Sequence, residues 1–351
     1  MSSYHDEENR KDIARLRELQ KELPLFLGEF FRARGDYTSA KTRLGYGYDL
    51  RLFFGFLTTE TREFGGIKPS DFSLKDLSRI KAIHIEEFME YLSYYIKHEE
   101  GNEYAVQNHQ SGKSRKLSAV RSMFAYYYRK EKIAANPAEL VQTPPIKERA
   151  KIYLDINEIA GLLDEAEKGN NLTKKQQDYH KSTNMRDLAI LTLLAGTGIR
   201  VSECVGLNLN DINLDDASFR VIRKGGDEAL LFFGPETQLS LHNYITLREQ
   251  IAPIEGHEQA LFLSMQRRRI TDRAVQNLVK KYSKTVSGFK NISPHKLRTS
   301  FGTHMYRQTG DIYLVADLLG HKDVNTTRKH YADTHRDRGR RAVNELRLRD
   351  E

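Results

Sequence analysis

The sequence predicts a mainly α-helical protein of two domains, the second of which also has a small antiparallel sheet. Three observations predict this fold class. At 351 residues the chain is too long for one typical hydrophobic core. Apolar residues recur at helical spacing through most of the chain. Residues 219–233 differ, because two β-favouring runs flank a glycine-containing turn there.

The first 140 residues indicate helices alone. Asp36-Tyr37-Thr38-Ser39 is a start signal for one of these helices, and Asn136-Pro137 stops the last of them. We expect helices at residues 7–22, 39–57 and 83–97, and a fourth from about residue 112 to the stop signal.

The segment between residues 136 and 155 has the composition of a linker, with two adjacent prolines, Pro144-Pro145, followed by a polar, cation-rich run. A domain boundary is therefore expected there. The predicted organisation is an N-terminal extension (1–20), a helical domain (21–145), a second domain (146–340) and a C-terminal tail (341–351).

The second domain is predicted to combine helices with a β-hairpin. Phe219–Ile222 and Leu230–Phe233 are the β-favouring runs, and Lys224-Gly225-Gly226-Asp227 is the turn between them. Helices are expected at residues 156–167, 184–195, 236–249, 271–285 and 294–309.

Composition narrows the class of function. The formal net charge of +8 suggests a polyanionic partner such as nucleic acid. The single cysteine, Cys204, excludes an intrachain disulfide and a cysteine-based zinc site. The sequence has no apolar run of the ~20 residues that a membrane span needs, and its polar N-terminus is unlike a signal peptide. We therefore expect a cytoplasmic protein without a membrane partner.

Two candidate functional groups lie near the middle of the second half. Arg200 follows two glycines in AGTGIRVSECVGL, where it either serves a site or pairs with Glu203 at a helical corner. This stretch is not a phosphate loop, because it lacks the closing Gly-Lys-Ser/Thr. Lys224 lies at the hairpin turn, where a solvent-exposed lysine is common.

The stretch SPHKLRTSFGTH, residues 293–304, predicts a helix that begins with a cap and a proline. With Ser293 as the cap, His295 and Arg298 lie one turn apart on one face, a pair suited to an anionic ligand at a helix N-terminus. The alternative is that they are ordinary surface charges. His304 and Arg307 repeat the spacing, and we interpret these two as ordinary helix surface.

The stretch LLGHKDVNTTRKHYADTH contains His321 and Tyr331. Taken alone, a tyrosine among cations is more often a packing residue than a nucleophile. In chain order, however, the sequence offers an arginine, a lysine, a His-x-x-Arg pair, a histidine and a tyrosine. Together these groups suit attack on a phosphodiester.

The chain resembles tyrosine recombinases of the phage integrase family, whose dispersed motifs are similar to GTGIRVSE, RKGG, SPHKLR, LLGH and Tyr331. The spacing of these motifs is similar to that of Xer-like two-domain members. The first half, including GKSRKLSAVRSMFAYYY, resembles the family's helical SAM-like core-binding domain. The remainder resembles its α-rich (α+β) catalytic domain. Two departures are visible: the stretch from His321 to Tyr331 is one residue longer than in the commonest members, and Thr299 stands where many have a histidine.

The resemblance implies DNA strand exchange through a 3′-phosphotyrosyl intermediate, with no metal, cofactor or ATP. It implies these roles: Tyr331 as the nucleophile, Arg200 and Arg298 as clamps on the phosphate, Lys224 as general acid, His295 as the group that orients or deprotonates the tyrosine, His321 as a hydrogen-bond donor to the phosphate, and Glu203 as a brace for the site.

The implied partner is double-stranded DNA with a specific palindromic core site, bound by a homotetramer on two paired sites. The tail at 341–351 is expected to dock on a neighbouring subunit or on its own domain. The candidate DNA-binding residues are Lys41, Arg43, Lys113, Arg115, Lys116, Arg121, Arg267, Arg268 and Arg269.

Several alternatives remain open at this stage. Xer-like chromosome dimer resolution competes with integration or transposition of a mobile element. A type IB topoisomerase would share the tyrosine chemistry, and an inactive, DNA-binding recombinase would lack one of the groups. A metal-dependent nuclease could use His295, His321, His330 and His335, although no carboxylate cluster accompanies them.

Overall fold

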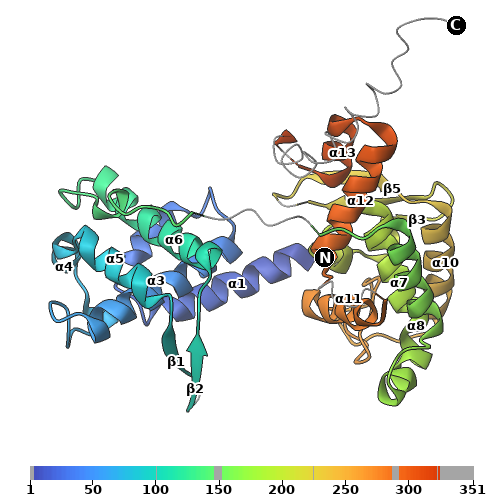
Figure 1. Ribbon diagram of the computed structural model, residues 1–351, viewed down its shortest axis with the longest axis horizontal. Helices are drawn as coiled ribbons and strands as arrows, with labels where there is room; N and C mark the ends of the chain where they lie inside the picture. Colours follow the sequence, from blue (N-terminus) through green and yellow to red (C-terminus); the bar gives the residue numbers. More distant parts are fainter. Residues whose placement is uncertain are drawn as a thin grey trace, which may run out of the picture. The chain divides into compact units, whose positions relative to one another are not determined.

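The computed structural model describes residues 4–99, 101–145, 152–223, 225–286, 292–321 and 323–324. The chain divides into two compact units, Met1–Arg149 and Ala150–Glu351. Both are mainly helical and the second contains a three-stranded antiparallel sheet, so the predicted fold class is confirmed (Figure 1). Of the helices described, none has an apolar stretch of the length that a bilayer requires.

The first unit packs its helices around an aromatic core. The side chains of Phe53, Phe88 and Tyr127 are fully buried, and the ring centroids of Phe53 and Phe88 lie 5.1 Å apart in an edge-to-face contact. The elements of this unit are α1 (Tyr4–Gln20), α2 (Leu27–Ala33), α3 (Ala40–Glu60), η1 (Pro69–Asp71), α4 (Leu74–Arg79), α5 (Ala82–Tyr91), β1 (Tyr95–Glu99), β2 (Asn102–Val106), α6 (Gln110–Arg129) and η2 (Pro137–Glu139).

Helix α1, which the sequence sets apart as an N-terminal extension, packs on α3 through Leu16 and Leu19, each 4% exposed. Gly47 on α3 makes this approach possible, because a Cβ there would overlap the Leu19 side chain. Most of α1 is therefore part of the helical unit. The start signal at Ser39 is confirmed, since its hydroxyl accepts a hydrogen bond from the Thr42 amide at 3.3 Å.

The prediction that the first 140 residues are all helical is wrong. The helix expected at 83–97 ends at Tyr91, and strands β1 and β2 follow as an antiparallel hairpin in which Tyr95 pairs with Val106. The physical signals were present in the sequence. Tyrosine and isoleucine favour strands, and Gly101 turns the chain with a φ of +78°.

The second unit surrounds one buried helix, α8, which packs against α7, α10 and α12. Residues Ala189 to Leu194 face neighbours on every side of α8, as expected for a central helix. The elements are α7 (Ile156–Lys168), α8 (Lys174–Thr197), α9 (Val201–Gly206), η3 (Leu209–Asp211), β3 (Ile212–Asn213), β4 (Ser218–Ile222), β5 (Glu228–Phe232), α10 (Pro235–Glu249), α11 (Asp272–Val286), α12 (Pro294–Thr309) and α13 (Ile312–Leu319).

The hairpin predicted in the second unit is confirmed as β4 and β5, with Phe219 opposite Leu231. Helix α8 begins earlier than the expected residue 184, at Lys174, because Thr173 and Gln176 form a capping box there.

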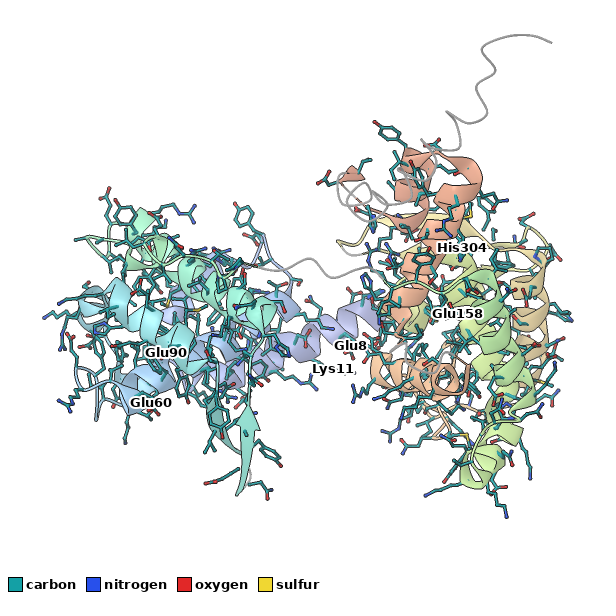
Figure 2. The ribbon with its side chains drawn as sticks, in the orientation of Figure 1. Glu8, Lys11, Glu60, Glu90, Glu158 and His304 are labelled. Atoms are coloured by element: carbon teal, nitrogen blue, oxygen red, sulfur yellow. The ribbon has the colours of Figure 1, made fainter. Side chains whose placement is uncertain are left out.

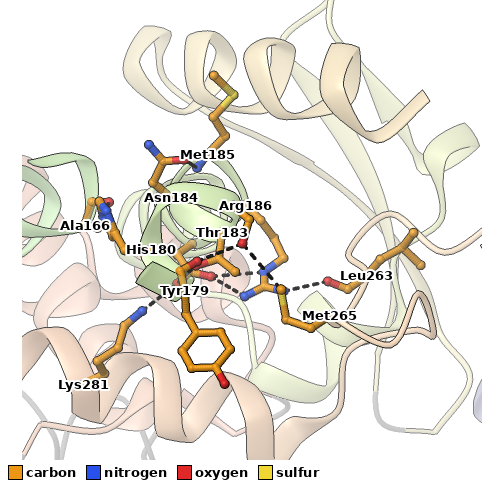
Figure 3. A network of polar contacts seen from close by, with 12 residues as sticks. Ala166, Tyr179, His180, Thr183, Asn184, Met185, Arg186, Leu263, Met265 and Lys281 are labelled. Carbon is orange, nitrogen blue, oxygen red and sulfur yellow. Dashed lines mark hydrogen bonds and ion pairs between the residues drawn. The ribbon is translucent and has the colours of Figure 1, made fainter. Parts of the chain in front are cut away.

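Asp187 is the centre of a buried polar network that joins α8 to α11. Figure 3 shows Thr183, Arg186 and Lys281, three members of this network. Its carboxylate accepts hydrogen bonds from Arg186 at 2.6 Å, Lys281 at 3.0 Å and Tyr282 at 2.8 Å. Burial and the nearby carboxylate raise the pKa of Tyr282, so its hydroxyl stays protonated and donates. The network fixes the helix whose C-terminal end leads to Arg200.

The interpretation as ordinary helix surface is wrong for His304, which is half-buried, whereas Arg307 is exposed as interpreted and also makes a specific contact. His304, labelled on α12 in Figure 2, has its Nε2 atom 2.8 Å from the Leu154 carbonyl. Arg307 donates to the Tyr153 hydroxyl at 2.6 Å and stacks over its ring. Ser300 also accepts a hydrogen bond from the Leu154 amide at 2.8 Å. These side chains therefore fasten the segment that precedes α7 to the helix that carries His295 and Arg298.

Candidate active site

Arg200 lies at a sharp corner between α8 and α9. Gly198 ends α8 in the left-handed region, with a φ of +64°, and a Cβ there would overlap the Phe301 ring. The Arg200 guanidinium donates to Glu203 at 2.7 Å and to the Gly320 carbonyl at 3.2 Å. The pairing with Glu203 foreseen as an alternative is thus present, and it aims the guanidinium at the end of α13.

Arg298 is on α12 and is 6% exposed. Its guanidinium donates to the Gly198 carbonyl at 2.6 Å and also to the Leu319 carbonyl. The predicted start of α12 is confirmed, with Ser293 at the N-cap and Pro294 at the first position, although no side-chain capping bond is present. Arg298 therefore links the end of α8 to the end of α13.

His295 precedes Arg298 by one helical turn, as its spacing predicted. Its pKa is lowered, first because neighbouring atoms displace water from the ring, and second because Arg298 and Arg200 carry positive charge nearby. The residue itself is exposed. A lowered pKa keeps the imidazole neutral at neutral pH, in the form that can accept a proton.

His321 follows directly after α13, whose end is capped by Gly320 in the left-handed region with a φ of +63°. The His321 amide donates to the Ala316 carbonyl at 2.9 Å. Arg200, Gly320 and His321 line one groove of about 730 Å³ together with residues of β5 and α13.

Three predicted groups thus come together from distant parts of the sequence: Arg200, Arg298 and His321. Their common neighbour is the C-terminal end of α13. Lys224 and Tyr331 lie outside the described residues. Within the described ranges, no three His, Cys, Asp or Glu side chains gather as a metal site would require.

Four of the predicted DNA-binding residues of the first unit, all on α6, are already bonded within that unit. Arg115 forms a bidentate ion pair with the buried Asp49, with one bond of 2.7 Å. On the same helix, Lys113 donates to Ser93 at 2.6 Å and Lys116 to Asn108 at 2.8 Å. Arg121 fastens the loop that contains Ala138, Val141 and Thr143. Lys41 is exposed and Arg43 is half-buried.

The arginine cluster of the second unit separates into two kinds of side chain. Arg267 and Arg268 are exposed. Arg269 instead donates to the Val205 carbonyl at 2.9 Å and to the Leu207 carbonyl at 2.7 Å. The fold therefore uses Arg269 to hold the segment after α9, a role that the sequence did not indicate.

The sequence model of the phage integrase family matches residues 153–338. The chain therefore belongs to this family, and it is a site-specific tyrosine recombinase. It is 31% identical over 295 residues to tyrosine recombinase XerC of Pelobacter propionicus, covering 83% of this chain and 84% of the relative.

Two solved structures share the fold. One is the XerH site-specific recombinase bound to palindromic difH substrate, with a TM-score of 0.62, 17% identity, and coverage of 91% of this chain and 84% of that one. The other is the Tn1549 transposon integrase in complex with transposon right end DNA, with a TM-score of 0.62, 19% identity, and coverage of 93% and 99%. A mobile-element enzyme and an Xer enzyme are thus equally similar in fold.

Proposed function

We propose that this chain is an Xer-like recombinase that cuts and rejoins DNA through a 3′-phosphotyrosyl intermediate, and that its role is chromosome dimer resolution. The observation that carries the proposal is the convergence of Arg200, Arg298 and His321 at the end of α13, with His295 one helical turn before Arg298. Two guanidinium groups and an imidazole placed together suit a phosphodiester whose charge rearranges during attack.

In the proposed cleavage step, the Tyr331 oxygen forms a bond to phosphorus while the bond from phosphorus to O5′ breaks. Arg200 and Arg298 hold the non-bridging oxygens, because a guanidinium fork matches two oxygens at once. His295 is the group suited to accept the tyrosine proton, since its lowered pKa keeps it neutral. Lys224 gives a proton to O5′, and His321 donates a hydrogen bond to the phosphate.

Rejoining reverses these steps. The 5′-hydroxyl of the partner strand attacks the phosphotyrosine, and the Tyr331 oxygen leaves. The covalent link conserves the energy of the phosphodiester bond, so the proposed reaction needs no ATP. The two guanidinium groups supply the stabilising charge, and His321 adds a hydrogen bond, so the proposed reaction also needs no added divalent metal.

The proposed assembly is a homotetramer on two paired palindromic sites, with DNA held by basic residues of both units. Family membership supports this assembly, and the XerH structure contains a palindromic substrate. The tail at 341–351, with Ala342, Val343 and Leu346, lies outside the described residues. Docking of that tail on a neighbouring subunit remains a prediction.

One experiment tests the chemistry. The protein is incubated in EDTA with nicked half-site duplexes that have randomised arms, and covalently attached DNA is recovered and sequenced. We expect an adduct that yields one arm sequence, and we expect Tyr331→Phe to abolish it while DNA binding persists. An adduct that survives this change, or that forms only with Mg²⁺, would contradict the proposal.

The arm sequence recovered in that experiment also tests the biological role. If the role is dimer resolution, the matching chromosome should contain one palindromic copy near the replication terminus. Copies at the ends of a mobile element, beside genes for excision or transfer, would instead favour integration or transposition.

A further inference from the structure

Arg223 is a third arginine at the C-terminal end of α13, beside Arg200 and Arg298. Both of its terminal guanidinium nitrogens lie 3.1 Å from the Asp317 carbonyl, and one lies 3.2 Å from the Leu318 carbonyl. The last carbonyls of a helix lack partners within the helix and carry partial negative charge. A guanidinium is therefore a stabilising cap at this end.

The fit between Arg223 and α13 depends on Gly320. This residue has a φ of +63°, and a Cβ added to it would overlap the Arg223 guanidinium. The left-handed glycine thus ends α13 and at the same time leaves room for the arginine.

The backbone of Arg223 closes the turn between β4 and β5. Its amide donates to the Asp227 carbonyl at 2.8 Å, and its carbonyl accepts from the Gly226 amide at 3.0 Å. Gly225 and Gly226 both have positive φ, +110° and +91°, and the described residues of the turn from Gly225 to Glu228 are exposed. The Arg223 side chain ties this turn to α13.

Loss of this contact would release the turn more than the helix. Helix α13 is also held by its buried residues Val315, Ala316 and Leu319, and by the hydrogen bonds from Arg200 and Arg298. The turn has exposed residues and two glycines, which are features of segments that open at low free-energy cost.

We propose that Arg223 is a positioning residue for strand cleavage, because its guanidinium anchors the β4–β5 turn on α13 and so limits where the next residue, Lys224, can reach. This inference rests on the proposed function, in which the Lys224 ammonium gives its proton to O5′ as the bond from phosphorus to O5′ breaks. Lys224 itself lies outside the described residues, and the restraint is the covalent one between neighbours in the chain.

Substitution of the leaving atom tests this route. The substrate is the duplex whose arm sequence is recovered in the adduct experiment described above. It is made in two versions, one with oxygen and one with sulfur at the 5′ bridging position of the scissile phosphate. A thiolate leaves without a proton, so cleavage of the sulfur substrate does not need a general acid. Single-turnover adduct formation is measured on both substrates for the native protein, Arg223→Gln and Lys224→Ala.

We expect Arg223→Gln to slow cleavage of the oxygen substrate by about 10- to 100-fold and to change cleavage of the sulfur substrate by less than about threefold. Arg223→Lys should lie between Arg223→Gln and the native protein, because one ammonium cannot replace both guanidinium donors. The matched control is Arg220→Gln on the same strand, since Arg220 pairs with Asp211 and Glu228 rather than with α13.

Suppose that sulfur restores cleavage by Lys224→Ala, so that the general acid is correctly assigned. The role of Arg223 is then overturned if Arg223→Gln slows cleavage of both substrates equally, or slows cleavage of neither. If Lys224→Ala is not rescued by sulfur, the assignment of the general acid fails, and the inference fails with it. Melting temperatures of the variants identify any loss that comes from unfolding.

Discussion

The arginines at the end of α13 and two cations near the start of α6, Lys113 and Arg115, use different kinds of partner. Arg200, Arg223 and Arg298 donate to main-chain carbonyls of residues 317–320. Lys113 and Arg115 on α6 donate instead to the side chains of Ser93 and Asp49. Main-chain partners move only when the fold moves, whereas side-chain partners can change rotamer when a phosphate arrives. The first arrangement suits chemistry that needs fixed geometry, and the second suits binding.

The largest effect that this comparison predicts is at Arg298. Arg298→Lys should slow single-turnover adduct formation by about 10³-fold, because an ammonium cannot keep both carbonyl contacts and also hold the phosphate. The rate is measured at saturating DNA. A loss of only a few-fold, in a variant with native melting temperature, would show that a fixed guanidinium is not needed there.

The pH dependence of cleavage should follow the lowered pKa of His295. The native rate should hold constant on acidification through the ordinary histidine value of about 6.5, and should fall only at lower pH, where the ring gains a proton. His295→Gln should be about 10²-fold slower at neutral pH and should lose this acidic fall. A native rate that already halves above pH 6.5 would contradict the neutral imidazole.

A smaller effect is expected on α6, and it should appear in binding rather than chemistry. Lys113→Ala should weaken DNA binding roughly three- to tenfold and reduce the slope of log affinity against log salt by about 1. Fluorescence anisotropy over a salt series measures both. The cleavage rate at saturating DNA should stay native, and a slower rate would remove the distinction between the two regions.

The smallest effect is expected at the exposed member of the arginine cluster. Arg267→Ala should change DNA affinity less than about threefold and leave the free energy of unfolding unchanged. Arg269→Ala should destabilise the fold by about 1–3 kcal/mol, because the Val205 and Leu207 carbonyls lose their donor. Urea unfolding of the two variants measures the difference, and equal stability would contradict the structural role of Arg269.

Local sequence signals predicted the fold class and most helix positions. Apolar spacing located α3, α6 and α12, and the glycine turn located β4 and β5. The β1–β2 hairpin was missed because Tyr95, its first residue, also continues the helical spacing of the apolar residues Ile85, Phe88, Met89 and Leu92. A short apolar run of this kind fits both the helical period and the strand period. The packing of Tyr95 and Val106 on the helical core decides in favour of the strand.

The sequence predicted which residues belong to the candidate site, but not which hydrogen bonds hold them. Dispersed motifs pointed to Arg200, His295, Arg298 and His321, and three of them meet the same helix end or groove. No spacing rule indicated that the ends of α8 and α13 would share a guanidinium, since Gly198 and Leu319 are far apart in sequence. The sequence also contained no sign of the structural contacts of His304, Arg269 and Arg223. Their partners are main-chain carbonyls that lie far away in the sequence.

The central claim is that the groups at the end of α13 serve a tyrosine that becomes joined to DNA. The most direct measurement is mass spectrometry of the proteolysed adduct formed in EDTA on the nicked duplex. We predict a nucleotide attached to the peptide that contains Tyr331, and to no other peptide. Attachment at another residue, or no adduct unless a divalent metal is added, would contradict the account.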